Sequence, residues 1–291
     1  MRHTTRLKTL LAERRALTLP GAANAMFARV IEEQGFEACY VTGAGIANMH
    51  LGAPDIGLTT LTEIATVLAP IADAVDLPLL VDADTGFGNG LNMARTVRVL
   101  ERAGAAGLQI EDQVFPKRCG HFAGKDVISC AEMVSKIKAA VDARRDGDLQ
   151  IVARTDARAV EGFNAAMDRA HAFIEAGADV LFVEAPVSLE EMERIARDLP
   201  VPQIANIVFG GKTPDPGRER LKEMGFAGVL YANALLQAAL RTSYEVLESL
   251  RDTGSLDAVA HRLASFEERQ RSVAKPHWDA LEAKYKVEEG K

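Results

Sequence analysis

The sequence predicts a (β/α)8 barrel of the TIM type, with an open doubly wound α/β sheet as the alternative. Its 291 residues are a normal length for one such barrel. Apolar segments of strand length alternate with segments of helical period along the chain. A glycine recurs between a helix and the strand that follows it. These three observations together indicate repeated β–α units around a parallel sheet.

Eight segments are predicted to be strands, and each ends in small or acidic residues. They are 19–22, 38–43, 77–84, 107–112, 149–156, 180–185, 202–207 and 228–232. Several are near-continuous runs of valine, isoleucine and leucine, as expected for parallel strands covered on both faces. Between them, segments such as 91–103 and 162–176 have the apolar period of a helix.

Four glycines support this alternation. Gly35, Gly104, Gly177 and Gly225 each follow a predicted helix and precede a predicted strand. Glycine adopts the left-handed conformation that ends a helix without the penalty of a Cβ atom. We therefore expect a helix to end at each of these positions.

The loop after the fourth strand is predicted to be long. Ser129 and Glu132 have the spacing of a capping box, so a helix should start after Ser129. Residues 114–128 then form an excursion at the face of the barrel where active sites lie and lids close.

The two ends of the chain extend this barrel. The first 17 residues are basic and have no acid before Glu13, as in an organelle transit peptide, but their leucines follow a helical period and favour a folded first helix. We expect a barrel domain over 1–253, including the helix after the eighth strand, and a C-terminal helical extension over 254–291. No segment approaches ~18 continuous apolar residues, so no membrane span is expected.

Composition narrows the class of function. The net charge of -7 gives no electrostatic reason to expect nucleic acid or an anionic membrane as a partner. Cys39, Cys119 and Cys130 form no CxxC pair, which argues against a disulfide framework and a structural zinc site. A small polar substrate and a reducing, cytoplasmic compartment fit best.

Carboxylates gather at the predicted ends of the strands. Asp82 and Asp84 are two residues apart, so both should project from the same side of the third strand. Glu111 and Glu184 end two further strands, and the ends of barrel strands converge on one mouth. Oxygen ligands of this kind suit Mg²⁺. The alternative is a pair of aspartates that only cap the loop.

An arginine and an asparagine are predicted at the same mouth. Arg154 lies near the end of the fifth predicted strand and Asn206 near the end of the seventh. An arginine beside a divalent cation would suit a substrate that carries a carboxylate, through a forked contact. The alternative is an ion pair of Arg154 with Glu184 or Asp156 that only orders the rim.

The stretch KRCGHFAGK, residues 117–125, contains a candidate reactive thiol. Cys119 lies beside Lys117, Arg118 and His121, and cationic neighbours favour the thiolate over the thiol. A solvated basic turn that happens to contain a cysteine is the alternative. Cys39, in an apolar strand, and Cys130, at a helix start, are expected to be core or cap residues.

With these residues assembled, the sequence resembles the isocitrate lyase and phosphoenolpyruvate mutase superfamily, within its lyase branch. The stretches that carry the resemblance are TGAG, LGAPDIGLTT, LPLLVDADTGFG, AGAAGLQIEDQ, PKRCGH, VARTDA, EGFNAAMDRA and AN at 205–206. The resemblance implies a barrel whose last helix is exchanged with a partner subunit, in a homotetramer built as a dimer of dimers.

The resemblance also implies a cofactor and a reaction. It implies Mg²⁺, with Mn²⁺ as an alternative, held by Asp82 and Asp84, with Asp55 and Glu111 holding its waters. Such lyases cleave the C2–C3 bond of a 2-hydroxy acid by retro-aldol chemistry and release a 2-oxo acid. Cys119 would be the acid that protonates the other fragment. The implied catalytic set is Cys119, Lys117, His121 and Glu111.

The implied substrate shell differs from the family in one place. The matching substrate-binding residues are Thr42, Gly43, Ala44, Gly120, Arg154, Glu184 and Asn206. Relatives that cleave 2-methylisocitrate have an arginine six residues after the tyrosine of the last strand, where this chain has Gln237 after Tyr231. Lys212 is a candidate substitute. We therefore favour a dicarboxylate such as 2,3-dimethylmalate, with 2-methylisocitrate as the alternative.

Three other functions fit the same scaffold. One is a phosphonomutase resembling the carboxyphosphonoenolpyruvate enzymes, and another is an oxaloacetate decarboxylase or hydrolase. The third is a catalytically silent barrel that binds a metabolite or serves as a structural subunit. The presence of the acids at the mouth and of Cys119 weighs against the silent barrel.

Overall fold

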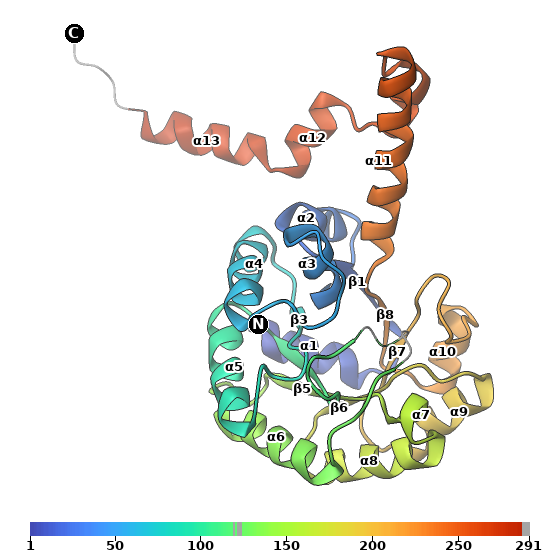
Figure 1. Ribbon diagram of the computed structural model, residues 1–291. Coiled ribbons are helices and arrows are strands. Elements are labelled where there is room, and N and C mark those ends of the chain that lie inside the picture. Colours follow the sequence, from blue (N-terminus) through green and yellow to red (C-terminus); the bar gives the residue numbers. More distant parts are fainter. Residues whose placement is uncertain (119, 121–123, 287–291) are drawn as a thin grey trace. The chain divides into compact units, whose positions relative to one another are not determined.

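The computed structural model describes residues 1–118, 120 and 124–286 (Figure 1). The chain divides into two compact units, Met1–Leu235 and Leu236–Lys291. Each unit is described by itself below.

The first unit is a (β/α)8 barrel, as the sequence predicts. Its strands are β1 (Leu17–Ala22), β2 (Cys39–Val41), β3 (Leu79–Asp82), β4 (Gly107–Glu111), β5 (Gln150–Thr155), β6 (Val180–Val183), β7 (Ile204–Asn206) and β8 (Gly228–Tyr231). All pairings between them are parallel, in the order β6-β5-β4-β3-β2-β1-β8-β7. A parallel bridge between Leu181 and Gln203 joins the two ends of this order and closes the barrel. All eight predicted strands are confirmed.

Helices surround the barrel, and α1 (His3–Ala12) lies across one end of it (Figure 1). The others are α2 (Ala25–Glu33), α3 (Gly43–His50), α4 (Leu61–Ala74), α5 (Gly90–Arg102), α6 (Cys130–Ala143), α7 (Ala157–Val160), α8 (Phe163–Glu175), α9 (Leu189–Asp198) and α10 (Arg218–Met224). The predicted glycines end their helices: Gly35, Gly104, Gly177 and Gly225 all have positive φ. Ser129 caps α6 by accepting from the backbone N–H of Glu132, as expected.

The alternation of side chains along β3 explains where the core and the polar residues go. Leu79 and Val81 belong to the hydrophobic cluster that includes the covering helices, whereas Leu80 belongs to a second cluster inside the barrel. Successive side chains of a strand point to opposite faces, so Asp82 shares the inner face with Leu80. The interior cluster also contains Leu7, Leu11, Leu19, Tyr40, Val152, Phe182, Ile204 and Leu230.

The N-terminal segment folds as the first helix, as predicted. In α1, Leu7 and Leu11 are fully buried and pack in the interior cluster of the barrel. These leucines are four residues apart and therefore lie on one face of the helix. The helix thus covers one end of the barrel interior, and the polar mouth lies at the other end.

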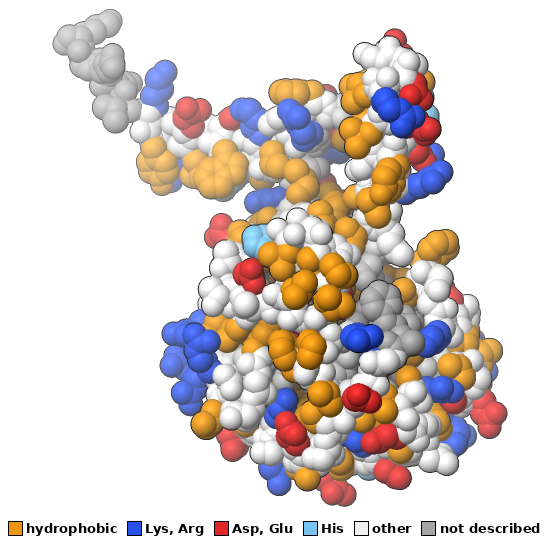
Figure 2. Space-filling view, in the orientation of Figure 1, with side chains coloured by type: hydrophobic (Ala, Val, Ile, Leu, Met, Phe, Trp, Pro, Cys, Tyr) orange, Lys and Arg blue, Asp and Glu red, His pale blue; other side chains and the backbone are white. Residues whose placement is uncertain are grey.

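The second unit is helical. It contains most of α11 (Ala234–Thr253), a 3-10 helix (Asp257–Arg262), α12 (Phe266–Ser272) and α13 (Lys275–Tyr285). No residue of these helices is buried. Hydrophobic side chains are exposed along this unit (Figure 2). Within the described ranges, no helix combines the length and apolarity needed to cross a membrane.

Candidate active site at the carboxyl ends of the strands

Polar side chains line the barrel mouth because they occupy the inward positions of successive strands. Each lies two residues after an inward residue of the same strand, and side chains two apart share a face. The pairs are Tyr40 and Thr42, Leu80 and Asp82, Gln109 and Glu111, Val152 and Arg154, Phe182 and Glu184, and Ile204 and Asn206. The ends of six strands therefore contribute to one site.

A small cavity of about 50 Å³ occupies this mouth. It is lined by Tyr40, Thr42, Ala44, Asp55, Asp82, Gln109, Lys117, Arg118, Gly120, Arg154, Phe182, Glu184, Asn206, Val208, Leu230, Ala232 and Asn233. Gly43, Asp84 and Glu111 contact residues of this lining without being part of it. The structure thus brings together the described candidates for the metal site, for catalysis and for the implied substrate shell. Cys119 and His121 lie outside the described residues.

Lys117 lies among the acids of the mouth. Its ammonium pairs with Asp55 and lies 2.8 Å from Oδ1 of Asp84. Burial lowers the pKa of Lys117, but the attraction of Asp84, Glu111, Asp82 and Asp55 outweighs burial and raises this pKa well above its usual value. The ammonium therefore stays charged and offsets the repulsion between the carboxylates.

Hydrogen bonds orient Asp82. Its Oδ2 accepts from the backbone N–H of Gly43 at 3.3 Å, and its Oδ1 accepts from the backbone N–H of Asp84 at 3.1 Å. The amide of Gln109 also donates to Oδ1, at 3.3 Å, and the hydroxyl of Tyr40 donates to the amide oxygen of Gln109, at 2.8 Å. The carboxylate is therefore held by three donors and has a fixed direction.

Asp84 lies just beyond the end of β3, in a left-handed backbone conformation with φ of 47°. Burial raises the pKa of Asp84 to about 6, although the ammonium of Lys117 acts in the opposite direction. The hydroxyl of Thr59 donates to its Oδ2 at 3.4 Å. Asp82 and Asp84 thus lie side by side with both carboxylates buried.

Arg154 is a second buried cation of the mouth, and acidic side chains surround it. Its guanidinium forks onto Asp156, with distances of 2.9 and 3.0 Å, and lies 3.1 Å from Oε2 of Glu111. It also lies 3.9 Å from Glu184 and stacks over the ring of Phe182, 5.3 Å from its centroid. The ion pairs of Arg154 with Asp156 and Glu184, which the sequence left as an alternative, are therefore present. They hold the guanidinium rigidly at the cavity.

Lys125 also contacts the residues around Arg154. The sequence did not indicate this role for Lys125. Its buried ammonium lies 2.6 Å from Oδ1 of Asp156 and donates to the carbonyl of Gly120. Burial raises the pKa of Asp156, but Arg154 and Lys125 lower it by more, so this carboxyl titrates below its usual range. Gly120 itself packs tightly: a Cβ there would lie 2.4 Å from Glu184 and 2.5 Å from Arg154.

Among the described residues, three buried oxygens of the mouth accept no hydrogen bond: Oδ1 of Asp84, Oε1 of Glu111 and Oδ1 of Asn206. Oδ1 of Asp84 is ion-paired with Lys117, whereas the other two have no such partner in the described part of the chain. Asn206 donates through its amide nitrogen to Glu184, at 3.3 and 3.4 Å. A buried acceptor without a donor is costly and indicates a missing partner such as a ligand, an ion or water.

The loop after β2 closes the remaining side of the mouth. Thr42 caps α3 by accepting from the backbone N–H of Gly45 at 3.1 Å, and its hydroxyl donates to the side chain of Asn233 at 3.2 Å. Gly43 approaches Asp82 so closely that a Cβ would lie 2.9 Å from the carboxylate. Any larger residue at this position would therefore displace the Asp82 carboxylate.

The acids could hold a divalent cation with the help of water. Within residues 1–118, 120 and 124–286, no group of three His, Cys, Asp or Glu side chains is arranged to hold a metal by itself. Mg²⁺ usually binds one or two carboxylates and keeps several waters, so it does not need three protein ligands. Asp82 and Asp84 supply two carboxylates, and the unpartnered oxygen of Glu111 fits the same requirement for a cation or its waters.

Two residues considered for the distal part of a substrate do not line the cavity. Lys212 is exposed and is absent from the lining. Gln237 belongs to the second unit. The lining of the cavity also includes the apolar side chains of Phe182, Val208 and Leu230.

Comparison with known proteins gives the family. The chain matches the family model described as phosphoenolpyruvate phosphomutase over residues 7–251. A 2,3-dimethylmalate lyase of Eubacterium barkeri is 42% identical over 268 residues, covering 92% of this chain and 93% of that protein. A 2-methylisocitrate lyase of Aeropyrum pernix is 47% identical over 257 residues, covering 88% of this chain and 82% of that protein.

Solved structures share the whole architecture. A crystal structure of 2,3-dimethylmalate lyase, a member of the PEP mutase/isocitrate lyase superfamily, aligns with a TM-score of 0.92 at 33% identity and covers 98% of this chain and 95% of that one. A phosphonopyruvate hydrolase complex with oxalate and Mg²⁺ aligns with a TM-score of 0.86 at 28% identity and covers 98% and 99% of the two chains. The chain belongs to the phosphoenolpyruvate mutase and isocitrate lyase superfamily.

Proposed function

We propose that the protein is a Mg²⁺-dependent carbon–carbon lyase, with Mn²⁺ as an alternative ion. It cleaves an alkyl-substituted 2-hydroxy dicarboxylate or tricarboxylate to a 2-oxo acid such as pyruvate and a second carboxylate such as propionate or succinate. One observation carries the proposal: the buried arginine Arg154 and the buried carboxylate Asp82 line one cavity at the barrel mouth, and the buried carboxylate Asp84 pairs with Lys117 of the same lining. The names of the curated relatives support the lyase reaction.

Asp82 and Asp84 would hold the ion, and Asp55 and Glu111 would hold its waters. The buried, unpartnered oxygen of Glu111 supports this assignment. A bound Mg²⁺ would polarise the C1 carboxylate and the C2 oxygen of the substrate and stabilise negative charge there. The relative crystallised with oxalate and Mg²⁺ supports the choice of ion.

Other residues of the mouth would bind the substrate and transfer protons. Arg154 would bind a substrate carboxylate, and Glu184 and Asn206 would position the fragment beside it. A carboxylate of the mouth, with Glu111 of the implied catalytic set as the candidate, would accept the proton of the C2 hydroxyl. The C2 oxygen then becomes a carbonyl as the C2–C3 bond breaks, and the electron pair of that bond collects on the second fragment as an enediolate. Cys119 would donate the proton that converts this enediolate to the product carboxylate. Lys117 and His121 would stabilise the resulting thiolate.

We propose a dicarboxylate of the 2,3-dimethylmalate type as the preferred substrate. The apolar side chains of Phe182, Val208 and Leu230 suit an alkyl substituent. A third carboxylate needs a cation, and Gln237 is neutral where 2-methylisocitrate lyases are expected to have arginine. 2-Methylisocitrate is the second candidate because a lyase of that name is 47% identical.

A product assay tests this function. The full chain is incubated with Mg²⁺ and either 2,3-dimethylmalate or 2-methylisocitrate, and the released 2-oxo acid is trapped as a hydrazone. We expect pyruvate from at least one of them, with more efficient turnover of 2,3-dimethylmalate. Pyruvate from neither would refute the lyase. Turnover of a phosphonate or of oxaloacetate would then identify the mutase or the hydrolase.

Thermal unfolding tests the metal site without any substrate. Mg²⁺ at 100 times its Kd is expected to stabilise the folded protein by about 2.7 kcal/mol, because it binds only the folded state. Asp82→Asn should lose this ion-dependent rise in Tm. Asp73→Asn, which changes an exposed acid on α4, should keep it. An equal rise in Tm for Asp82→Asn and the parent would rule out Asp82 as a ligand.

We also propose that the protein is cytoplasmic.

We further propose that α11 pairs with a second copy of the chain, as in a helix-swapped tetramer. Leu240, Tyr244, Leu247 and Leu250 recur with helical spacing along α11 and are between 40 and 65% exposed. An apolar stripe of this kind is unfavourable in water without a partner.

Replacing Tyr244 and Leu247 together by glutamate is expected to convert the oligomer to a smaller species. Charge in a buried helix interface is costly to desolvate, so the interface should separate. Light scattering coupled to gel filtration measures the mass. Glu248→Gln, on the same helix, is the control and should leave the mass unchanged. A parent protein that is monomeric would contradict the proposal.

A further inference from the structure

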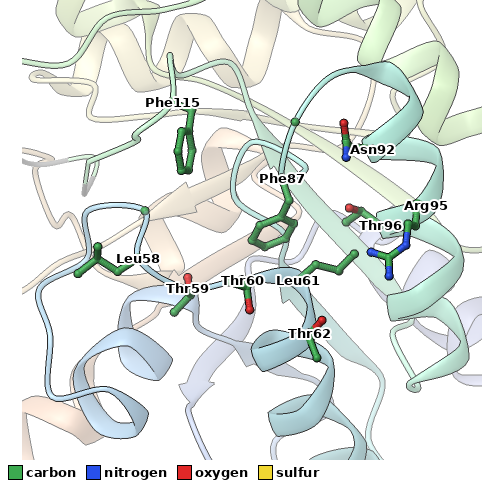
Figure 3. A pocket seen from close by; sticks show the side chains of 12 residues that line it. Leu58, Thr59, Thr60, Leu61, Thr62, Phe87, Asn92, Arg95, Thr96 and Phe115 are labelled. Atoms are coloured by element: carbon green, nitrogen blue, oxygen red, sulfur yellow. The ribbon is translucent and has the colours of Figure 1, made fainter.

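A second and larger pocket lies outside the mouth. Its volume is about 480 Å³, which is within the range of small-molecule sites. The segment 57–62, the turn after β3, the first turns of α5 and Phe115 form its wall (Figure 3). It shares no lining residue with the cavity of the mouth. The pocket is therefore a separate candidate site.

Apolar side chains form one part of the pocket. Leu58, Leu61, Phe87 and Phe115 line it, and they come from three different loops or helix starts (Figure 3). Phe115 is 63% exposed and Leu58 is 53% exposed, although burying an apolar side chain is favourable by about 1.5–3 kcal/mol. These exposed side chains would gain most from a ligand with an apolar body.

A cation forms the polar edge. Arg95 of α5 lines the pocket, and within the described part of the chain its side chain has neither an ion pair nor a hydrogen bond. Asn92 lies one turn earlier on the same helix and also lines the pocket (Figure 3). An arginine fork with a neighbouring amide is suited to a carboxylate.

Phe87 is held in an unusual backbone conformation at the centre of this wall. Its φ is 58°, in the left-handed region that bulky residues rarely adopt. Such a conformation is strained and is found at ligand sites and other functional positions. Figure 3 shows its ring directed toward the space between Leu61 and Phe115.

From these observations we propose that the pocket binds a small monocarboxylate with an aromatic or branched aliphatic body. The carboxylate pairs with Arg95, and the apolar body packs between Phe87, Phe115 and Leu58. The unpaired cation selects an acid over a neutral analogue, and the apolar walls select against a small polar anion such as phosphate.

Two segments of the chain contribute residues both to the pocket and to the mouth. Asp55 and Lys117 line the mouth, whereas Leu58 and Phe115, a few residues away, line the pocket. Thr59 lines the pocket and donates to Asp84. A ligand in the pocket would therefore contact the same two segments from the other side, without entering the mouth.

The experiment titrates the full chain with 4-fluorophenylacetate and observes the fluorine resonance. Its neutral amide, 4-fluorophenylacetamide, is the matched probe. We expect the acid to bind at least about tenfold more tightly than the amide, since a charge-assisted contact of about 1.4 kcal/mol corresponds to tenfold. Equal affinities, or no binding of the acid at millimolar concentration, would overturn the proposal.

Variants assign the binding to the pocket. Arg95→Gln should weaken acid binding about tenfold, and Phe115→Ala should weaken binding of both probes, because it removes an apolar wall. Arg98→Gln, an exposed arginine one turn further along α5, should bind as the parent does. Arg154→Gln should also leave the affinity unchanged. Loss of binding in Arg154→Gln with full binding in Arg95→Gln would place the probe in the mouth and refute the proposal.

Discussion

Arg154→Gln is expected to lower kcat/KM by roughly 10²–10³-fold, as the loss of about 2.7–4 kcal/mol of transition-state stabilisation implies. Glutamine keeps much of the volume but carries no charge and cannot form the forked contact. The same change leaves Glu111, Asp156 and Glu184 buried with one cation fewer. We therefore also expect a loss of stability of about 3–5 kcal/mol.

Steady-state kinetics with the cleaved 2-hydroxy acid and urea unfolding measure the two effects separately. Arg158→Gln is a matched control, because Arg158 forks onto Glu191, at 2.8 and 3.0 Å, away from the mouth. It should cost at most about 1 kcal/mol of stability and leave kcat/KM unchanged. Arg154→Lys restores the charge without the fork and should recover only part of the activity. Parent-like kinetics of Arg154→Gln would show that the guanidinium does not bind substrate.

Much of the fold and the mouth could be predicted from the sequence because a β-strand has a side-chain period of two. The parallel strands are apolar runs, and the residue that ends each run is easily found. The period also separates two neighbouring acids, Glu111 and Asp112. Glu111 is inward and meets Arg154, whereas Asp112 accepts from the backbone N–H of Asp156 at 2.9 Å and from Thr155 at 2.8 Å. Asp112 is thereby a structural acid that orders the end of β5.

The same period could have identified residues that were missed. Tyr40 lies two residues before Thr42, and Gln109 two residues before Glu111, so both had to point into the barrel. In the sequence, Tyr40 and Gln109 look like ordinary strand residues because their neighbours are apolar. Their hydrogen-bonded pair, which orients Asp82, follows from the register of β2, β3 and β4 and not from either residue alone.

The contacts made by loop residues could not be predicted from the sequence. Lys117 was a candidate only as a neighbour of a cysteine, yet its ammonium reaches Asp55, which is 62 residues earlier in the chain. Lys125 reaches Asp156 and Gly120 in a similar way. No hydrophobic period specifies the path of such a loop. Contacts across the mouth, each of which pairs a buried charge, determine it instead.

The division of the chain also depends on contacts that a sequence does not contain. The sequence placed the helix after the eighth strand within a domain ending at 253, whereas the compact units separate at Leu235 and Leu236. The apolar stripe of α11 is the reason for proposing a partner for this helix, but the period of a helix does not specify which surface it contacts. Swapping of this helix stays a prediction.

Cys119→Ser is expected to lower kcat by roughly 10²–10⁴-fold, the usual contribution of a general acid. A serine hydroxyl is a far weaker acid than a thiol and leaves a much less stable anion after proton transfer. Cys119 lies outside the described residues, but Arg118 and Gly120 on either side line the mouth. Binding of Mg²⁺ and oxalate should be unchanged, because the acids and Arg154 remain in place. Calorimetry measures this binding, and single-turnover kinetics measures cleavage.

Cys130→Ser is the matched control for this thiol. Cys130 starts α6 and is half-buried, away from the cavity lining, so its replacement should leave kcat unchanged. Cys39 is a poorer control, since it is buried in β2 and burial raises its pKa to about 12. Loss of cleavage with retained oxalate binding, in Cys119→Ser alone, would separate proton donation from substrate binding. Full cleavage by Cys119→Ser would move the acid to another residue, and Lys117 and His121 would be the next candidates.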